Sequence, residues 1–269
     1  MPAHDTPAHD TNVEPQPLYF RKQGQGEPVV ILHGLFGSME NLGAQARALA
    51  KHFCVYSIDL PNHGRSAHGA TMTLSSMAAQ VNDWMEAQGL PSASFVGHSL
   101  GGKVAMELVL QQPEKCQKLV VLDIAPVHYE PHHTKVFKGL LALNPAQLVS
   151  RTDADTQLKR EVSEPAVRSF LLKNLVKEAQ GFSWRMNLPV IYASYPNLIT
   201  ANTLPETPYE GDVLFIKGGK SDYILEQHRD AIAARFPKAK LRLVSGVGHW
   251  LHAEKPEHVA QLVMHFLQH

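Results

Sequence analysis

The sequence lacks several features that define whole classes of protein. It contains only two cysteines in 269 residues, and both Cys54 and Cys116 lie within or beside an apolar segment. This is typical of buried thiols in a reducing compartment rather than of a disulfide framework. No apolar run approaches the roughly 20 residues of a membrane span, and the N-terminus has no basic region followed by an apolar one. We therefore expect a cytoplasmic protein without a membrane span.

An excess of charge is also missing. The 25 Lys and Arg residues balance the 25 Asp and Glu residues, so the formal net charge is zero with His neutral. Surfaces that bind nucleic acids or anionic membranes need an excess of basic residues. We expect a small neutral molecule as the partner, no nucleic acid, and a monomer or homodimer.

Motifs of metal and cofactor sites are absent as well. Although the chain has 16 histidines, it contains neither H-E-x-x-H nor C-x-x-C. Residues 2–6 read PAHDT and residues 7–11 repeat it. The Pro and Thr around these His and Asp residues, without apolar neighbours, favour a solvated tail over a metal site. We predict no metal, no cofactor and a disordered tail over residues 1–16.

What the sequence does contain is an alternation of short β-branched or apolar runs with longer amphipathic segments. The predicted strands are Leu18–Arg21, Val29–His33, Cys54–Ile58, Ser94–Gly97, Leu119–Leu122, Val213–Lys217 and Leu241–Val244. The predicted helices include Leu74–Ala87, Lys103–Gln111, Leu225–Phe236 and Pro256–Leu267. This order predicts an α/β protein with a mostly parallel central sheet and helices on both faces. In such sheets reactive groups gather at the carboxyl ends of the strands.

One interval breaks the alternation. Between residues 128 and 205 we find no convincing strand, only helix-like pieces such as TKVFKGLLAL and EPAVRSFLLKNLV. We predict that residues 128–205 form a helical lid inserted into a core made of residues 17–127 and 206–269.

The stretch FVGHSLGG places Ser99 in a G-x-S-x-G pattern between a predicted strand and a predicted helix. In this context the pattern predicts a nucleophile elbow, because a β-carbon at either flanking glycine would collide with the neighbouring strand or helix. The alternative is a serine that caps a helix, which needs no flanking glycines. We interpret Ser99 as the nucleophile.

A serine hydroxyl needs a base, and His249 is the best candidate. It follows the last predicted strand and precedes the last helix, at the same end of the sheet as Ser99. We assign His252 a structural role, and we expect the elbow to turn the side chain of His98 away from Ser99. An oxyanion would be held by the N–H groups of Leu35, after His33-Gly34, and of Leu100, at a helix N-terminus.

The segments HGLFGS, DLPNHGRS, GHSLGGKVAM, LDIAP and GHWLHAEKP together resemble the α/β-hydrolase superfamily. In detail they are similar to its small bacterial esterases of the YbfF type, relatives of the ABHD11-like hydrolases. The resemblance extends from about Leu18 to the C-terminus, and it implies the α/β-hydrolase fold with a Ser-His-acid triad.

Two residues compete for the acid that orients the base. Asp222 has the usual place in the sequence order, after the penultimate strand, but it lies one position late for a G-x-x-D pattern. Asp123 ends the preceding strand, and its carboxylate could also reach the histidine. The resemblance implies Asp123 as the acid and Ser221 as an assisting hydrogen-bonding group. We take Asp123 as the acid and keep Asp222 as the alternative.

These assignments predict a serine esterase that hydrolyses carboxylic esters with short to medium acyl chains, with acyl thioesters open to the same chemistry. Alternatives are a carbon-carbon bond hydrolase or perhydrolase with the same triad, and a ligand-binding receptor without activity. The substrate pocket would draw on Phe36 and Trp250. Lid side chains are further candidates, of which we expect only a part to touch substrate: Phe137, Leu140, Leu141, Phe170, Leu171, Trp184 and Tyr192, together with Leu35.

Overall fold

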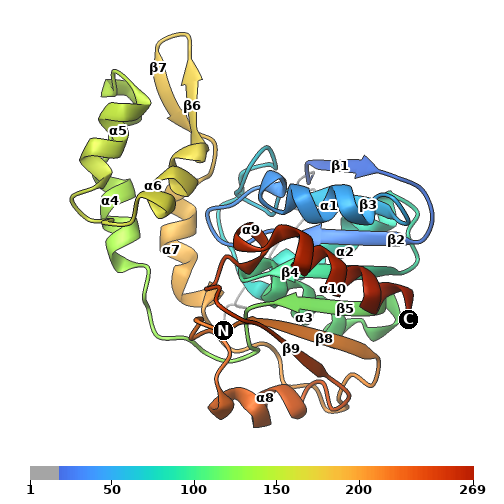
Figure 1. Ribbon diagram of the computed structural model, residues 1–269. Helices are drawn as coiled ribbons and strands as arrows, with labels where there is room; N and C mark the ends of the chain where they lie inside the picture. The colour runs from blue at the N-terminus through green and yellow to red at the C-terminus, as the bar shows by residue number, and fades with distance from the viewer. Residues whose placement is uncertain (1–17) are drawn as a thin grey trace, which may run out of the picture.

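A seven-stranded sheet forms the centre of the protein in the computed structural model, which describes residues 18–269. The predicted disordered tail lies outside the described residues. The strands are β1 (Phe20–Gln23), β2 (Pro28–Leu32), β3 (Cys54–Ile58), β4 (Ala93–His98), β5 (Cys116–Leu122), β8 (Asp212–Gly218) and β9 (Lys240–Val244). Their order is β1-β3-β2-β4-β5-β8-β9 (Figure 1). Each predicted strand is present, with ends that differ by a few residues.

The sheet is parallel except at one edge, where β1 pairs with β3 in the antiparallel direction. The central strands read as continuous apolar runs because both of their faces are covered. In β2, for example, Val29 to Leu32 are all buried. The carboxyl ends of these strands therefore share one edge of the sheet, where loops can bring distant residues together.

Helices cover both faces of the sheet (Figure 1). One face holds α1 (Gly43–Leu49), α9 (Leu251–Glu254) and α10 (Pro256–Gln268), and the other holds α2 (Leu74–Ala87), α3 (Leu100–Gln111) and α8 (Arg229–Ala233). Helix α2 begins where Thr73 Oγ1 accepts a hydrogen bond from the Ser76 N–H at 3.0 Å. The prediction for Leu225–Phe236 was too long, because a 3-10 turn at Glu226–His228 precedes the short α8.

The predicted insertion, residues 128–205, lies between β5 and β8, and we call these residues the inserted segment. It contains α4 (Thr134–Ala142), α5 (Arg151–Leu158), α6 (Pro165–Leu171), α7 (Leu188–Leu198) and a hairpin of β6 (Leu175–Glu178) and β7 (Gly181–Trp184). The expectation of a segment without strands was wrong at this hairpin. Gly181, at φ 90°, adopts the left-handed backbone that closes the turn. In Figure 1 the segment stands to one side of the sheet, over the strand ends.

Both ends of the inserted segment are fastened to α3. Lys103 lies on α3, four residues after Ser99, and its side chain is buried. The ammonium group donates to the Val127 carbonyl at 2.8 Å and also to the Thr200 carbonyl. Burial lowers the pKa of Lys103 to about 7. Because one side chain holds the start and the end of the segment, both ends are fixed to the helix that begins at Ser99.

Among the helices of residues 18–269, none combines the length and the apolar character that crossing a bilayer requires. Within the same residues, Cys54 is buried and Cys116 is half-buried, and both are free thiols.

Candidate active site

Ser99 occupies a sharp turn between β4 and α3. Its backbone adopts φ 52° and ψ −119°, a strained conformation for a residue with a side chain. A β-carbon on Gly97 would lie 2.4 Å from the Gly101 carbonyl oxygen, and one on Gly101 would lie 2.3 Å from that of Leu32. Only glycine fits at these two places, as the pattern predicts. Ser99 makes no capping hydrogen bond with its side chain, which argues against the helix-cap interpretation.

Asp123 contacts the ring of His249. The carboxylate directly follows β5 and is fully buried. Its Oδ2 lies 2.8 Å from His249 Nδ1 and also accepts a hydrogen bond from the Ser221 hydroxyl. Its Oδ1 accepts from the Gly218 N–H at 2.8 Å. The carboxylate, the ring and the assisting serine thus meet, as the resemblance to the YbfF-type esterases implies.

Asp222, the alternative acid, lies elsewhere. Its side chain is exposed to solvent, although its neighbour Ser221 is buried against Asp123. Two neighbouring side chains in this loop therefore point in different directions: Ser221 points toward Asp123, and Asp222 points toward solvent.

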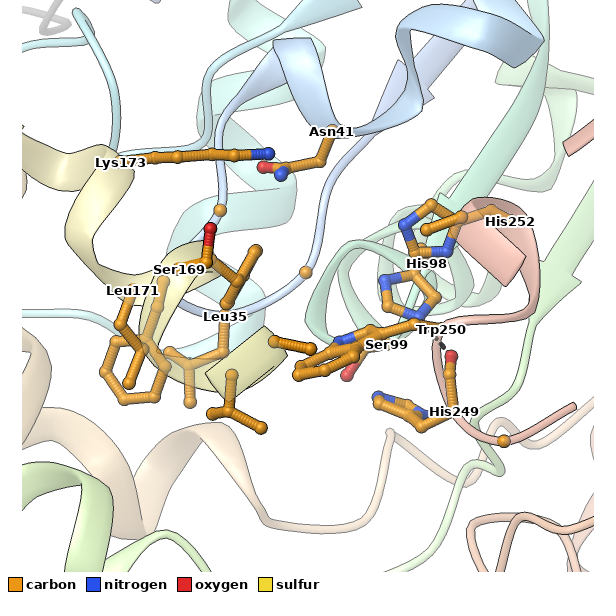
Figure 2. Close-up of a pocket in the computed structure, with 18 of the residues that line it drawn as sticks. Leu35, Asn41, His98, Ser99, Ser169, Leu171, Lys173, His249, Trp250 and His252 are labelled. Atoms are coloured by element: carbon orange, nitrogen blue, oxygen red, sulfur yellow. Dashed lines mark hydrogen bonds between the residues drawn. The ribbon is translucent and has the colours of Figure 1, made fainter. Parts of the chain in front are cut away.

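Ser99 and His249 line the same cavity (Figure 2). Within residues 18–269, the ring of His249 makes its hydrogen bond through Nδ1 to Asp123, and no hydrogen bond joins it to Ser99 Oγ. Catalytic contacts of this kind are often long without substrate and tighten in the complex. Since Nδ1 is engaged, Nε2 is the nitrogen that remains for Ser99.

Two more histidines surround the His249 loop. His98 Nε2 lies 2.9 Å from the carbonyl oxygen of His249, and its ring centroid lies 4.2 Å from that of His252. Burial lowers the pKa of His252 to about 4 and that of His98 well below its ordinary value. Both rings are therefore neutral near pH 7. His98 supports the backbone of His249 as a local packing residue, and it also reaches the cavity wall.

The loop with the proposed oxyanion donors is held by two other buried histidines. His33 accepts a hydrogen bond from the Leu60 N–H at 2.9 Å through Nε2, so Nδ1 carries the proton and donates to the Gly34 carbonyl at 2.8 Å. His63 Nε2 accepts from the Phe36 N–H at 3.3 Å. Outside the helices and strands of residues 18–269, no backbone hydrogen bond is donated by the Leu35 N–H. Leu100 is the first residue of α3, where the N–H groups of a helix have no partner within the helix.

We predict that the buried, neutral His33 makes the folded state less stable as the pH falls. Burial lowers the pKa of His33 from 6.5 to about 4. Between these values the unfolded chain binds the proton and the folded chain does not, so the free energy of unfolding decreases toward low pH. The loss from His33 alone is roughly 3 kcal/mol over the window. Urea unfolding from pH 7 to pH 4 measures it, with His33→Gln as the comparison. An equal pH slope in both proteins would contradict the prediction.

A cavity of about 730 Å³ opens above Ser99, between the core and the inserted segment (Figure 2). Its apolar wall is formed by Leu35, Phe36, Val136, Val167, Phe170, Leu171 and Trp250, and Asn41, Ser169 and Lys173 make part of its wall polar. Two members of the proposed pocket, Phe36 and Trp250, therefore line it, as do Leu35, Phe170 and Leu171.

The other proposed pocket residues lie outside this cavity. Phe137 is buried in the inserted segment, where its ring centroid lies 5.1 Å from that of Phe36. Trp184, on β7, is half-buried, and Tyr192, on α7, is 52% exposed. For Phe137 the physical reason is helix rotation, because Val136 faces the cavity and the next residue along α4 points about 100° away. Trp184 and Tyr192 lie on elements, β7 and α7, that contribute no residue to the cavity wall. The assignment of these three residues to the pocket is corrected accordingly.

Sequence reasoning missed Tyr223, whose ring lies against His249, and the supporting role of His33. A signal existed for the tyrosine, because it stands two positions after Ser221 in the same loop. For His33 the signal was its place before Gly34, in the loop that follows β2. The DLPNHGRS segment indicates turn chemistry at His63 that holds the loop beside the site, and His63 does contact the Phe36 N–H.

The fold and this arrangement define an α/β hydrolase. The family described as alpha/beta hydrolase fold matches residues 27–256, and the chain belongs to it. Esterase YbfF of Escherichia coli (strain K12) is 37% identical over 248 residues, which are 92% of this chain and 95% of that protein. The sn-1-specific diacylglycerol lipase ABHD11 of Mus musculus is 37% identical over 247 residues, covering 89% and 80% of the two chains.

Among solved structures, the marine microorganism esterase is similar with a TM-score of 0.91 and 39% identity, over 93% of this chain and 99% of that one. The expected fold and the resemblance to YbfF-type esterases are thereby confirmed.

Proposed function

We propose that the protein is a serine esterase in which Ser99, His249 and Asp123 form the catalytic triad. One observation carries the proposal: a serine on a strained turn and an imidazole bonded to a buried carboxylate line the same cavity. The names of the relatives, an esterase and a diacylglycerol lipase, support ester hydrolysis as the reaction.

In the proposed reaction His249 removes the proton of Ser99 as the hydroxyl attacks the ester carbonyl. The N–H groups of Leu35 and Leu100 bind the oxyanion of the tetrahedral intermediate. His249 then gives its proton to the leaving alcohol, and water releases the acyl group by the reverse route. Asp123 keeps the ring in the tautomer with Nδ1–H, and Ser221 donates a hydrogen bond that holds the carboxylate in place.

The inserted segment acts as a lid in this proposal, since α4 and α6 supply much of the apolar wall above Ser99. A cavity of about 730 Å³ lies within the range of small-molecule sites. Short to medium acyl chains would fit, and acyl thioesters share the same chemistry. A carbon-carbon bond hydrolase or perhydrolase could use the same triad, but no contact of the cavity favours either.

Hydrolysis of p-nitrophenyl esters of increasing acyl length tests the proposal. We expect turnover of the acetate, butyrate and octanoate esters and a marked fall with palmitate, as a preference for short to medium acyl chains implies. A fluorophosphonate should label the wild-type protein at Ser99. If the protein hydrolyses none of these esters and is not labelled by the fluorophosphonate, the ligand-binding receptor is favoured instead.

A further inference from the structure

The ring of Tyr223 lies flat against the imidazole of His249. The two ring centroids are 3.7 Å apart and the planes differ by 14°. Tyr223 comes from the loop after β8, and His249 from the loop after β9. The reaction described above gives this tyrosine no task, although it touches the base over a whole ring face.

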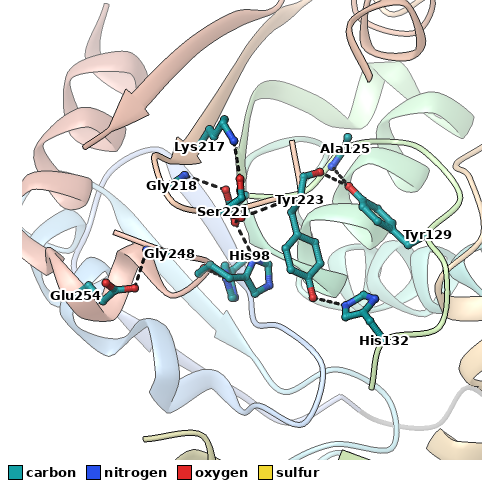
Figure 3. A network of polar contacts seen from close by, with 12 residues as sticks. His98, Ala125, Tyr129, His132, Lys217, Gly218, Ser221, Tyr223, Gly248 and Glu254 are labelled. Carbon is teal, nitrogen blue, oxygen red and sulfur yellow. Dashed lines mark hydrogen bonds and ion pairs between the residues drawn. The ribbon is translucent and has the colours of Figure 1, made fainter. Parts of the chain in front are cut away.

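The backbone of Tyr223 is fixed to the loops that hold the acid. Its N–H donates to Ser221 Oγ at 3.2 Å. Its carbonyl accepts from the Tyr129 hydroxyl at 2.5 Å, and that hydroxyl accepts from the Ala125 N–H at 2.8 Å. Figure 3 shows Tyr223 with Ser221 and Tyr129. Since Ser221 also makes a hydrogen bond to Asp123, the ring is held in a fixed relation to the carboxylate.

The hydroxyl of Tyr223 is bonded to the inserted segment. His132 Nδ1 lies 2.9 Å from the Glu130 carbonyl, so this nitrogen carries the proton and Nε2 accepts from the Tyr223 hydroxyl. Burial raises the pKa of Tyr223, so the phenol stays protonated and neutral. The tyrosine is thus held at its backbone and at its tip, and its ring has little freedom to rotate.

We propose that Tyr223 is a positioning residue for the reaction: its ring fixes the plane of the His249 imidazole, so that Nε2 stays directed at Ser99. This inference rests on the proposed function. The hydrogen bond to Asp123 fixes Nδ1 of His249, but the imidazole can still rotate about the line from Nδ1 to the carboxylate oxygen. A flat contact with a second ring restricts this rotation. The electron-rich face of the phenol also favours the imidazolium that forms in the transition state.

Two substitutions of Tyr223 distinguish the effect of its ring from that of its hydroxyl group. Tyr223→Phe keeps the ring and loses the bond to His132, whereas Tyr223→Leu loses the ring. We expect Tyr223→Leu to lower kcat for p-nitrophenyl butyrate by about 10- to 30-fold, because small misplacements of a base have large effects on rate. Tyr223→Phe should stay within about threefold of wild type, since the stacked face is retained. Tyr19→Leu, beside β1 at the far edge of the sheet, is the matched control.

A pH profile separates this role from simple packing. Without the ring the imidazolium loses stabilisation, so the acidic limb of kcat/KM moves to lower pH in Tyr223→Leu and stays in place in Tyr223→Phe. The other titratable groups that face His249 are Asp123, His98, His133 and His252. Burial lowers the pKa of His133 to about 3 and that of His252 to about 4, and it lowers that of His98 as well. These three rings therefore stay neutral over the limb.

Each outcome has a definite meaning when thermal unfolding and the rate of fluorophosphonate labelling are measured alongside. A slow Tyr223→Leu with a near-normal Tyr223→Phe and an unchanged KM supports the proposal. A wild-type rate in Tyr223→Leu, or an equal loss in both variants, overturns it. If Tyr223→Leu fails to fold, a wild-type rate and acidic limb in Tyr223→Phe support the role of the ring, and a loss there contradicts it. A wild-type protein inert to both ester and fluorophosphonate contradicts the proposed function itself.

Discussion

Ser99→Ala is expected to lower kcat for ester hydrolysis by about a millionfold and to abolish labelling by a fluorophosphonate. The loss is this large because His249 and the two N–H groups have no other hydroxyl in the elbow to act upon. Stability should change by less than about 1 kcal/mol, since alanine keeps the β-carbon at the same backbone angles and Ser99 makes no capping bond.

The measurement is single-turnover and steady-state hydrolysis of p-nitrophenyl butyrate, with intact-protein mass spectrometry for the label. Ser92→Ala, at the opposite end of β4, serves as the matched control and should behave as wild type. If Ser99→Ala retained more than a small fraction of the wild-type activity, another nucleophile would be responsible and the proposed triad would be wrong.

Asp123→Asn is expected to lower kcat by about 10⁴-fold, whereas Asp222→Asn should remain within about twofold of wild type. The carboxylate of Asp123 accepts hydrogen bonds from three donors, on Gly218, Ser221 and His249. An asparagine amide has an N–H₂ group in place of one oxygen, so one of these donors would face another donor. The imidazole would then lose either its orientation or its Nδ1–H tautomer.

The same conflict should reduce the free energy of unfolding of Asp123→Asn by about 1 to 3 kcal/mol, because a buried donor is left unsatisfied. Circular dichroism at the assay temperature therefore accompanies the kinetics, so that only folded protein is compared. A greater loss of rate in Asp222→Asn than in Asp123→Asn would reverse the assignment of the acid.

The fold followed from the sequence because its strands are buried on both faces and are therefore unbroken apolar runs. The run VVIL of β2 and the run LVVL of β5 are examples, and in both all four residues are buried. The hairpin β6–β7 escaped prediction because each of its strands has four residues, most of them only partly buried or exposed. Such short strands lack the pattern that a packed sheet imposes.

The candidate site was predictable where a motif fixes the backbone and unpredictable where a side chain rotates into place. Gly97 and Gly101 can be nothing but glycine, so they revealed Ser99. The choice between Asp123 and Asp222 depended on the direction of a side chain in a loop, which periodicity does not encode. The same holds for Phe137, which is buried one position away from the cavity-facing Val136.

Lys103 joins both ends of the inserted segment to α3. The chain leaves the core and returns to it within reach of one ammonium group. The segment between these points also contacts the core elsewhere, since Asn174 Nδ2 donates to the Phe36 carbonyl and the Asn187 N–H donates to the Asn62 carbonyl. A change of sequence in the segment would therefore also be felt by the loops that follow β2 and β3, so that substrate preference and the support of the site would evolve together.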